Sequence, residues 1–299
     1  MGKFYDAIMG LVVGDALGVP FEFRQRDTFT ADGMTGFGTY NQPPGTWSDD
    51  SSMTIATIES LVRKNMISPY DIMCNFYRWM YDGEFTPNGE VFDVGNTTRM
   101  SITRFANGVN YLRCGGFAEW DNGNGSLMRI LPLAFLNCDL RDVAKVSSLT
   151  HGNLISIQAC EIYVWIAKML LEGKDIREAI EHRMQPGYYL HESFGRLKAL
   201  ERLRRDEIKS TGFVVDTLEA ALWCVLNTDN YRDCVLMAVN LGGDTDTIAA
   251  VAGGLAGILY GIGGNNGIPE EWIDQIVKRE YIKDLCEAFE SRFCLDQGE

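Results

Sequence analysis

The sequence is poor in residues that bind transition metals and lacks segments that direct a chain into a membrane. It has three histidines and eight cysteines in 299 residues, with no Cys-x-x-Cys pair and no histidine at zinc-finger spacing. We therefore expect free thiols in a reducing cytoplasm, without a zinc site. Neither a run of about 18 apolar residues nor a charged and then apolar leader occurs, which predicts a cytoplasmic protein with no membrane partner.

Positive charge is also scarce. Lys and Arg number 27 against 41 Asp and Glu, so the formal net charge is −14, whereas a nucleic-acid binder normally carries a basic stripe. Apolar residues make up 46% and charged residues 23% of the chain, a composition typical of a folded globular protein. We expect a monomer that has no nucleic-acid partner.

Strand patterns are missing as well. No stretch alternates strictly between apolar and polar residues, whereas a 3.6-residue period recurs along the chain. The segments expected to be helical are 3–17, 48–63, 69–81, 96–107, 125–136, 140–149, 155–171, 176–182, 194–206, 214–226, 231–241, 245–259, 271–278 and 282–293. No linker or repeat divides the chain, so residues 1–299 are expected to form a single compact, multi-helix, all-α domain.

What the sequence does contain is two acidic clusters, each at the start of an expected helix. One is Ser48-Asp49-Asp50-Ser51 and the other is Gly242-Gly243-Asp244-Thr245-Asp246-Thr247. Helix capping accounts for one acid per helix, but adjacent carboxylates repel each other. If the clusters converge, their oxygens would suit Mg²⁺, Mn²⁺ or Ca²⁺. The glycine pair would leave room for a ligand, and the small residues over 248–257 predict a central, closely packed helix.

A third feature is the glycine-rich turn Asp121-Asn122-Gly123-Asn124-Gly125-Ser126-Leu127-Met128-Arg129. Backbone N–H groups in this turn, together with the amino end of the helix expected after it, could hold a phosphate. It is not a Walker loop, because no Gly-Lys-Ser follows. An ordinary Asn-Gly turn is the alternative interpretation.

Five motifs in order carry a family resemblance. They lie at residues 14–18 (Gly-Asp-Ala-Leu-Gly), 47–51, 123–129, 150–151 (Thr-His) and 242–247. Together they resemble the ADP-ribosylglycohydrolase family, which includes the dinitrogenase reductase-activating glycohydrolases, over roughly Phe4 to Gly261. The resemblance implies an all-α fold with two Mg²⁺ or Mn²⁺ ions in a central cleft.

The same resemblance assigns roles to individual residues. The positions that match metal ligands are Ser48, Asp49, Asp50, Asp244, Asp246 and Thr247, with Ser48 standing where the family usually has Thr. The positions that match the substrate cleft are Asn96, Gly123, Asn124, Gly125, Ser126, Met128 and His151. Glu22, which matches an acid on the family's mobile flap, and Asp93 are the two candidates for proton transfer, and Asp246 is counted with them as catalytic.

The activity that the resemblance implies is hydrolysis of an ADP-ribosyl bond. The substrate would be an ADP-ribosylated protein, with an arginine N-glycosidic linkage favoured, or an ADP-ribosyl small molecule. Three alternatives stay open: a serine O-linked substrate, a catalytically silent ADP-ribose-binding or structural member of the fold, and a hydrolase of phosphoesters.

Overall fold

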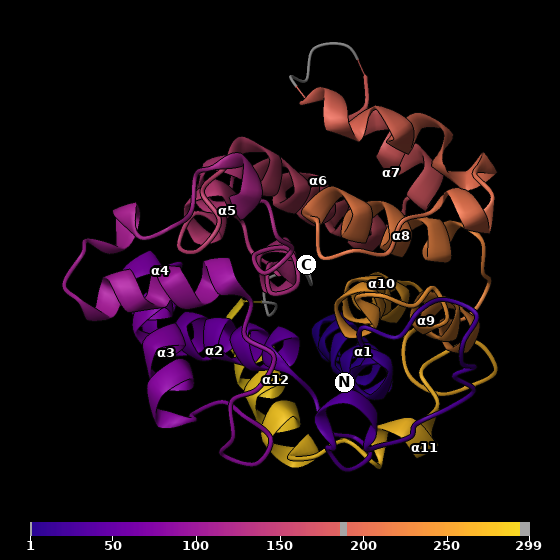
Figure 1. The fold of residues 1–299 in the computed structure, drawn as a ribbon, viewed down its shortest axis with the longest axis horizontal. Helices are drawn as coiled ribbons and strands as arrows, with labels where there is room; N and C mark the ends of the chain where they lie inside the picture. Colours follow the sequence, from indigo (N-terminus) through magenta and orange to yellow (C-terminus); the bar gives the residue numbers. More distant parts are fainter. Residues whose placement is uncertain (1, 186–189, 294–299) are drawn as a thin grey trace.

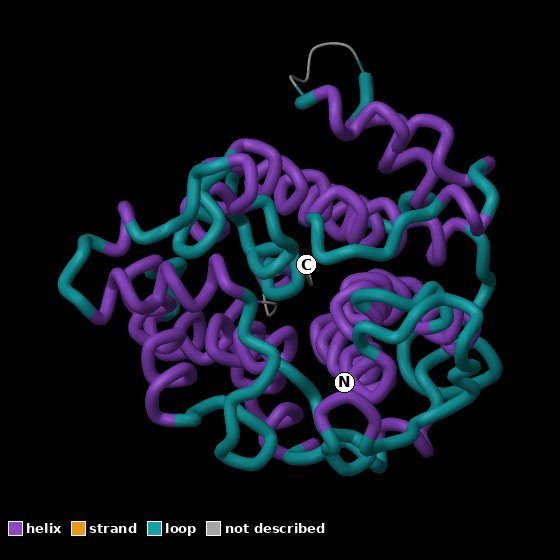
Figure 2. The backbone as a smooth tube through the Cα atoms, in the orientation of Figure 1, coloured by secondary structure: helices purple, strands orange, loops and turns teal. Residues whose placement is uncertain are grey.

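The computed structural model describes residues 2–185 and 190–293. Over these residues the backbone consists of helices joined by loops, with only isolated bridges and no strand, which confirms the predicted all-α class (Figure 2). The α-helices are α1 (Lys3–Gly18), α2 (Asp49–Lys64), α3 (Pro69–Asp82), α4 (Asn96–Ala106), α5 (Leu140–Ser147), α6 (Leu154–Leu171), α7 (Ile176–Arg183), α8 (Val214–Leu226), α9 (Tyr231–Val239), α10 (Thr245–Tyr260), α11 (Glu270–Ile273) and α12 (Arg279–Phe293).

Helices α1 and α10 lie side by side near the centre of the molecule (Figure 1). A Cβ added to Gly10 would lie 2.3 Å from the carbonyl oxygen of Gly253, and one added to Gly257 would lie 2.4 Å from that of Asp6. A Cβ cannot lie so close to a carbonyl oxygen, so the two helix backbones make contact at positions where the residues are glycine. The predicted central helix over 245–259 is confirmed.

Three segments expected to be α-helical are not. The expected helix over 125–136 forms turns over 125–129, followed by the 3₁₀-helix η5 (Leu131–Phe135), in which Pro132 lies in the first turn and has no N–H to donate. The segment 194–206 forms most of the 3₁₀-helix η6 (Glu192–Arg202), and 271–278 is α-helical only over its first three residues, which belong to α11 (Glu270–Ile273). The apolar pattern therefore located these elements but not their hydrogen-bonding type.

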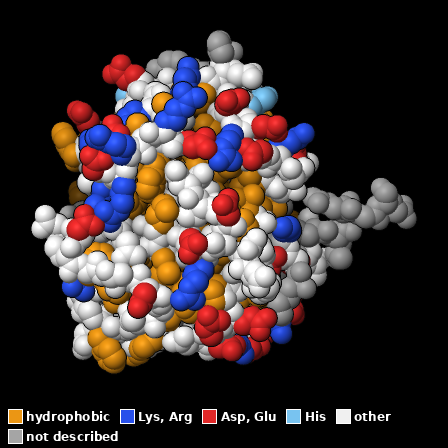
Figure 3. Space-filling model, turned by 90° about the vertical axis from the view of Figure 1, so that its right-hand side faces the viewer, with side chains coloured by type: hydrophobic (Ala, Val, Ile, Leu, Met, Phe, Trp, Pro, Cys, Tyr) orange, Lys and Arg blue, Asp and Glu red, His pale blue; other side chains and the backbone are white. Residues whose placement is uncertain are grey.

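Within the described residues, two helical segments have the length and hydropathy of a membrane span: Lys3–Phe21 and α6. In the first, 94% of the apolar window is buried inside the fold, as expected of the core helix of a globular domain. On the face shown in Figure 3, Lys and Arg side chains lie beside Asp and Glu side chains rather than in a stripe of one sign. The seven described cysteines are all free.

Candidate active site and metal centre

The carboxyl end of α1 meets the amino ends of α2 and α10. Asp15, in the last turn of α1, accepts hydrogen bonds from the backbone N–H of Ser48 (2.9 Å) and of Ser51 (3.0 Å). At the start of α10, Thr245 Oγ1 donates to the carbonyl oxygen of Gly18 (2.8 Å). These contacts hold the two predicted acidic segments against the same helix end.

Two groups of carboxylates converge there. One oxygen from each of Asp15, Asp50 and Asp246 lies within 4.8 Å of the other two, and the same holds for Glu22, Asp93 and Asp246. Asp246 therefore belongs to both groups. The predicted convergence of residues 48–50 with 244–247 is present, with the two proton-transfer candidates beside it.

Four carboxylate oxygens in this cluster are buried and have no hydrogen-bond partner: Asp50 Oδ1, Asp244 Oδ1, Asp246 Oδ2 and Glu22 Oε2. Burial, and then the neighbouring acids, raises the pKa of Asp50 and of Asp246 well above the usual range. Unpaired buried carboxylates are costly, and an all-oxygen donor set suits hard divalent cations. The residues present therefore fit a metal centre.

Helix capping explains only part of the cluster. Ser48 Oγ accepts a hydrogen bond from the backbone N–H of Asp50 (3.3 Å), as a capping residue should. Asp244 makes no side-chain capping bond at the start of α10; its Oδ2 instead accepts from Asn124 Nδ2 (2.8 Å). The hydroxyls of Ser48 and Thr247 both donate to Asp50 Oδ2, at 3.1 and 3.2 Å. They orient one carboxylate, and their ligation of a metal stays a prediction.

A cleft of about 240 Å³ opens above these acids. The predicted site residues that line it are Glu22, Asp49, Asp93, Asn96, Gly123, Asn124, Gly125, Met128, His151, Asp244 and Thr247. Ser48, Asp50 and Asp246 are buried beneath it. One predicted substrate residue points elsewhere: the hydroxyl of Ser126 is buried between Ser147 Oγ (3.0 Å) and Cys160 Sγ (3.4 Å). Its side chain supports the turn from behind and does not reach the cleft.

The glycine-rich turn forms one wall of the cleft, but no α-helix begins after it. The expected contribution of a helix amino terminus to phosphate binding is therefore absent at this turn. Asn124 fixes the turn by donating to Thr217 Oγ1 (2.9 Å) as well as to Asp244. A Cβ on Gly125 would lie 2.8 Å from Thr98 Oγ1 and 2.9 Å from His151 Cε1. Glycine is needed here because the turn packs directly against the histidine ring.

The pair Gly242-Gly243 is required for a different reason than the expected one, which was room for a ligand. Both glycines have positive φ (+69° and +74°). A Cβ on Gly242 would lie 2.6 Å from the backbone nitrogen of Arg26, and one on Gly243 would lie 2.1 Å from the carbonyl oxygen of Ser210. The pair admits neighbouring backbone, not a ligand.

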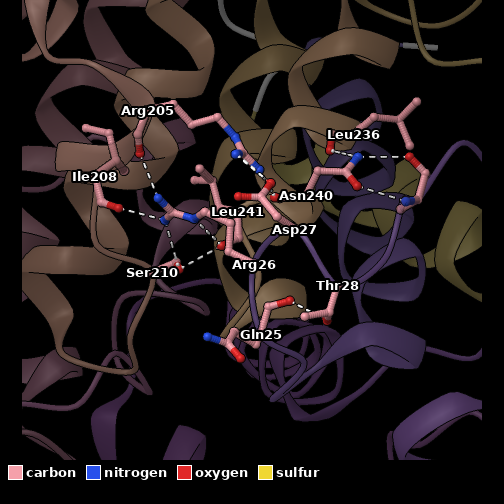
Figure 4. Close-up of polar contacts among 11 residues, drawn as sticks. Gln25, Arg26, Asp27, Thr28, Arg205, Ile208, Ser210, Leu236, Asn240 and Leu241 are labelled. Carbon is pink, nitrogen blue, oxygen red and sulfur yellow. Dashed lines mark hydrogen bonds and ion pairs between the residues drawn. The ribbon is translucent and has the colours of Figure 1, made fainter.

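Arg26 fastens the loop that carries Glu22 (Figure 4). Its guanidinium donates to the carbonyl oxygens of Leu241 (2.7 Å), Arg205 (2.7 Å) and Ile208 (2.6 Å). Nearby, the backbone N–H of Phe23 donates to the carbonyl of Gly243 (2.7 Å). The loop expected to be a mobile flap is thus joined, over 23–26, to the segment that precedes Asp244.

The second proton-transfer candidate has a partner of its own. Tyr40 donates its hydroxyl hydrogen to Asp93 Oδ1 at 2.6 Å. Glu22 is 4% exposed, and burial followed by the charge of Asp93 raises its pKa to about 9. Sequence reasoning gave no role to Tyr40, Arg26 or Asp15. Only Asp15 had a signal, because it stands inside the first of the five motifs.

Comparisons with known proteins agree along the whole chain. The family model described as ADP-ribosylglycohydrolase matches residues 1–298. The chain is 35% identical to the ADP-ribosylarginine hydrolase Tri1 of Serratia proteamaculans, over 96% of this chain and 78% of that protein. It is 31% identical to the ADP-ribosyl-dinitrogen reductase glycohydrolase of Rhodospirillum rubrum, over 93% and 92%.

A solved structure described as an ADP-ribosylglycohydrolase-related protein complex superimposes with a TM-score of 0.82 at 30% identity, covering 97% of both chains. The shared sequence and fold confirm the resemblance drawn from the five motifs: the chain belongs to the ADP-ribosylglycohydrolase family of hydrolases.

Proposed function

We propose that this protein hydrolyses the bond between ADP-ribose and an arginine side chain. Water adds to C1″ of the distal ribose, the C1″–N bond breaks, and the guanidine leaves with a proton, giving ADP-ribose and arginine. The relatives named for arginine and dinitrogen reductase substrates support the linkage. The observation that carries the chemistry is the set of buried, unpartnered carboxylate oxygens beneath a cleft walled by glycine.

We propose two Mg²⁺ or Mn²⁺ ions as the cofactor, which residues 48–50 and 244–247 would hold. When bound, such ions supply positive charge that orients ribose hydroxyls and lowers the pKa of a water. The chain's own residues do the rest. Asn124 holds the glycine turn against Asp244, His151 lines the cleft behind that turn, and Glu22 offers an unpartnered oxygen for a proton.

The test is a panel of defined linkages assayed with Mg²⁺ and with Mn²⁺. Arginine-linked ADP-ribosyl peptide should release ADP-ribose faster than a serine-linked peptide does, and chelation should stop the reaction. Faster release from serine would move the proposal to the O-linked class. Binding of ADP-ribose without turnover of any linkage would mark a silent member, and release of inorganic phosphate a phosphoesterase.

We further propose that the protein works as a monomer in the cytoplasm, with neither nucleic acid nor membrane as partner. Its free described cysteines suit a reducing compartment. Sedimentation of the purified protein tests the oligomeric state.

Gly125→Ala should weaken ADP-ribose binding about 10- to 100-fold while leaving metal binding unchanged. The new methyl group must push aside both the hydroxyl of Thr98 and the ring of His151, because each lies within 2.9 Å of the added Cβ. Calorimetry with free ADP-ribose measures the first effect and titration with Mn²⁺ the second.

Gly195→Ala is the matched control, since a Cβ there meets nothing within 4 Å and its φ is not positive. The control should bind ADP-ribose normally. Unchanged affinity in Gly125→Ala would contradict the assignment of this turn to the substrate.

A further inference from the structure

Arg129 is a buried cation that the proposed reaction does not use. Its side chain is 0% exposed and its guanidinium lies over the ring of Phe76, 4.5 Å from the ring centre. Nη2 donates to Thr150 Oγ1 (2.8 Å) and to the carbonyl of Val146 (3.3 Å), whereas Nε and Nη1 have no hydrogen-bond partner. No acid forms an ion pair with it in the described part of the chain. A buried guanidinium without a counter-ion is costly, so its position calls for a functional reason.

The partner of Arg129 links it to the cleft. Thr150 is fully buried, and its Oγ1 lies 2.8 Å from His151 Nδ1 as well as 2.8 Å from Arg129 Nη2. Arginine can only donate, so it occupies a lone pair of the hydroxyl. The hydroxyl hydrogen then has one acceptor within the described contacts, the Nδ1 of His151. The arrangement that satisfies every buried group has Thr150 donating to Nδ1.

This direction of donation fixes the protonation of the ring. With Nδ1 acting as acceptor, a neutral imidazole carries its hydrogen on Nε2. Nε2 faces the glycine turn, 3.4 Å from where a Cβ of Gly123 would lie and 3.5 Å from that of Gly125. Burial, and then the charge of Arg129, lowers the pKa of His151 to about 3. The ring therefore stays neutral and presents an N–H to the cleft.

We propose that Arg129 and Thr150 are positioning residues that lock His151 as the Nε2–H tautomer, so that it donates a hydrogen bond to an anionic phosphate oxygen of the ligand. The identity of that ligand as ADP-ribose rests on the proposed function. The lock itself does not, because it is a property of the protein without ligand. A ring able to flip tautomer would spend part of its time presenting a lone pair to the phosphate, which repels it.

The direct test is ¹⁵N NMR of the histidine side chains in the ligand-free, full-length protein. Only three histidines occur, so His151→Gln identifies the signals of His151 by subtraction. We expect Nε2 protonated and Nδ1 unprotonated at neutral pH. A protonated Nδ1 in the unmodified protein would overturn the proposal, whatever any variant does.

Variants connect the tautomer to binding. Thr150→Val keeps the shape but removes the donor; it should release the Nε2–H preference and weaken ADP-ribose binding about tenfold, as expected for one buried hydrogen bond. Thr150→Ser should restore both the tautomer and the affinity. Thr57→Val is the control: Thr57 is also fully buried, and its hydroxyl bonds only the helix carbonyl of Met53 (2.8 Å). That variant should change neither readout.

The outcomes separate the two proposals. If Thr150→Val changes the tautomer but leaves the affinity within twofold, the positioning role is wrong. If the tautomer is as stated and the enzyme releases no ADP-ribose from any linkage, the proposed function fails and the lock stands.

Discussion

Asp246→Asn is expected to abolish metal-dependent hydrolysis, lowering kcat/KM by about 10³-fold or more. Asp246 is the one acid that belongs to both carboxylate groups, and its Oδ2 is buried without a partner. An amide of the same shape cannot supply the charge a divalent cation needs. Loss of several kcal/mol of electrostatic stabilisation corresponds to a rate effect of this size.

In the metal-free protein, the same substitution should not lower the thermal stability and could raise it. Asp246 lies among Asp50, Glu22 and Asp93 with no cation to offset the repulsion, so removing its charge should leave the metal-free Tm equal or higher. In the unmodified protein a metal at 100 times its Kd adds about 2.7 kcal/mol to the free energy of unfolding. Thermal unfolding with EDTA, Mg²⁺ or Mn²⁺ should show that this gain disappears in the variant.

Asp216→Asn provides the matched control. Asp216 is also a buried acid in the first turn of a helix, α8, but its Oδ2 accepts from Thr211 Oγ1 (2.7 Å) and it lies outside both groups. Its replacement should leave the metal-induced rise in Tm intact. A full Mg²⁺-dependent shift in Asp246→Asn would place the metal centre elsewhere.

The parts of the fold that sequence predicted are those governed by local pattern. Small residues over 248–257 identified the helix that packs on α1, since Gly253 and Gly257 tolerate no side chain at that contact. The acids at the starts of α2 and α10 indicated the metal centre. Capping accounts for one acid per helix, whereas a second carboxylate next to the first is repelled by it. The ordered motifs then located the cleft residues.

What sequence could not predict depends on contacts between distant segments. Arg26 becomes informative only when three carbonyls from residues 205–241 surround it, and Tyr40 only when Asp93 lies 2.6 Å away. The pair Gly242-Gly243 looked like space for a ligand and proved to be space for backbone. The expected helix over 125–136 begins with turns instead, and the backbone N–H of Asn124 donates to the carbonyl of Gly212 (3.0 Å), a contact between distant segments that apolar periodicity does not register.

Glu22→Gln is expected to lower kcat about 100-fold or more while changing ADP-ribose affinity by less than threefold. Glu22 lines the cleft and keeps one oxygen free of any partner, whereas Asp93 Oδ1 is occupied by the hydroxyl of Tyr40. The amide fills the same space but can neither take up nor release a proton, and proton transfer by a positioned side chain contributes about 10²- to 10⁴-fold. Single-turnover rates on arginine-linked peptide, with ADP-ribose binding by calorimetry, separate the two effects.

Asp93→Asn is the comparison that assigns the role. Its amide can still contact the hydroxyl of Tyr40, so the variant should keep the shape of the cleft. Its kcat should stay at least tenfold higher than that of Glu22→Gln. Tyr40→Phe, which removes the hydrogen bond but leaves both carboxylates, should match Asp93→Asn if this pair only positions the loop. If Asp93→Asn lowers kcat more than Glu22→Gln does, the proton-transfer role belongs to Asp93. Glu22 would then have only a supporting role in the acidic cluster. The two carboxylates lie within 4.8 Å of each other, so only such a direct comparison distinguishes the group that moves the proton from the one that holds it in place.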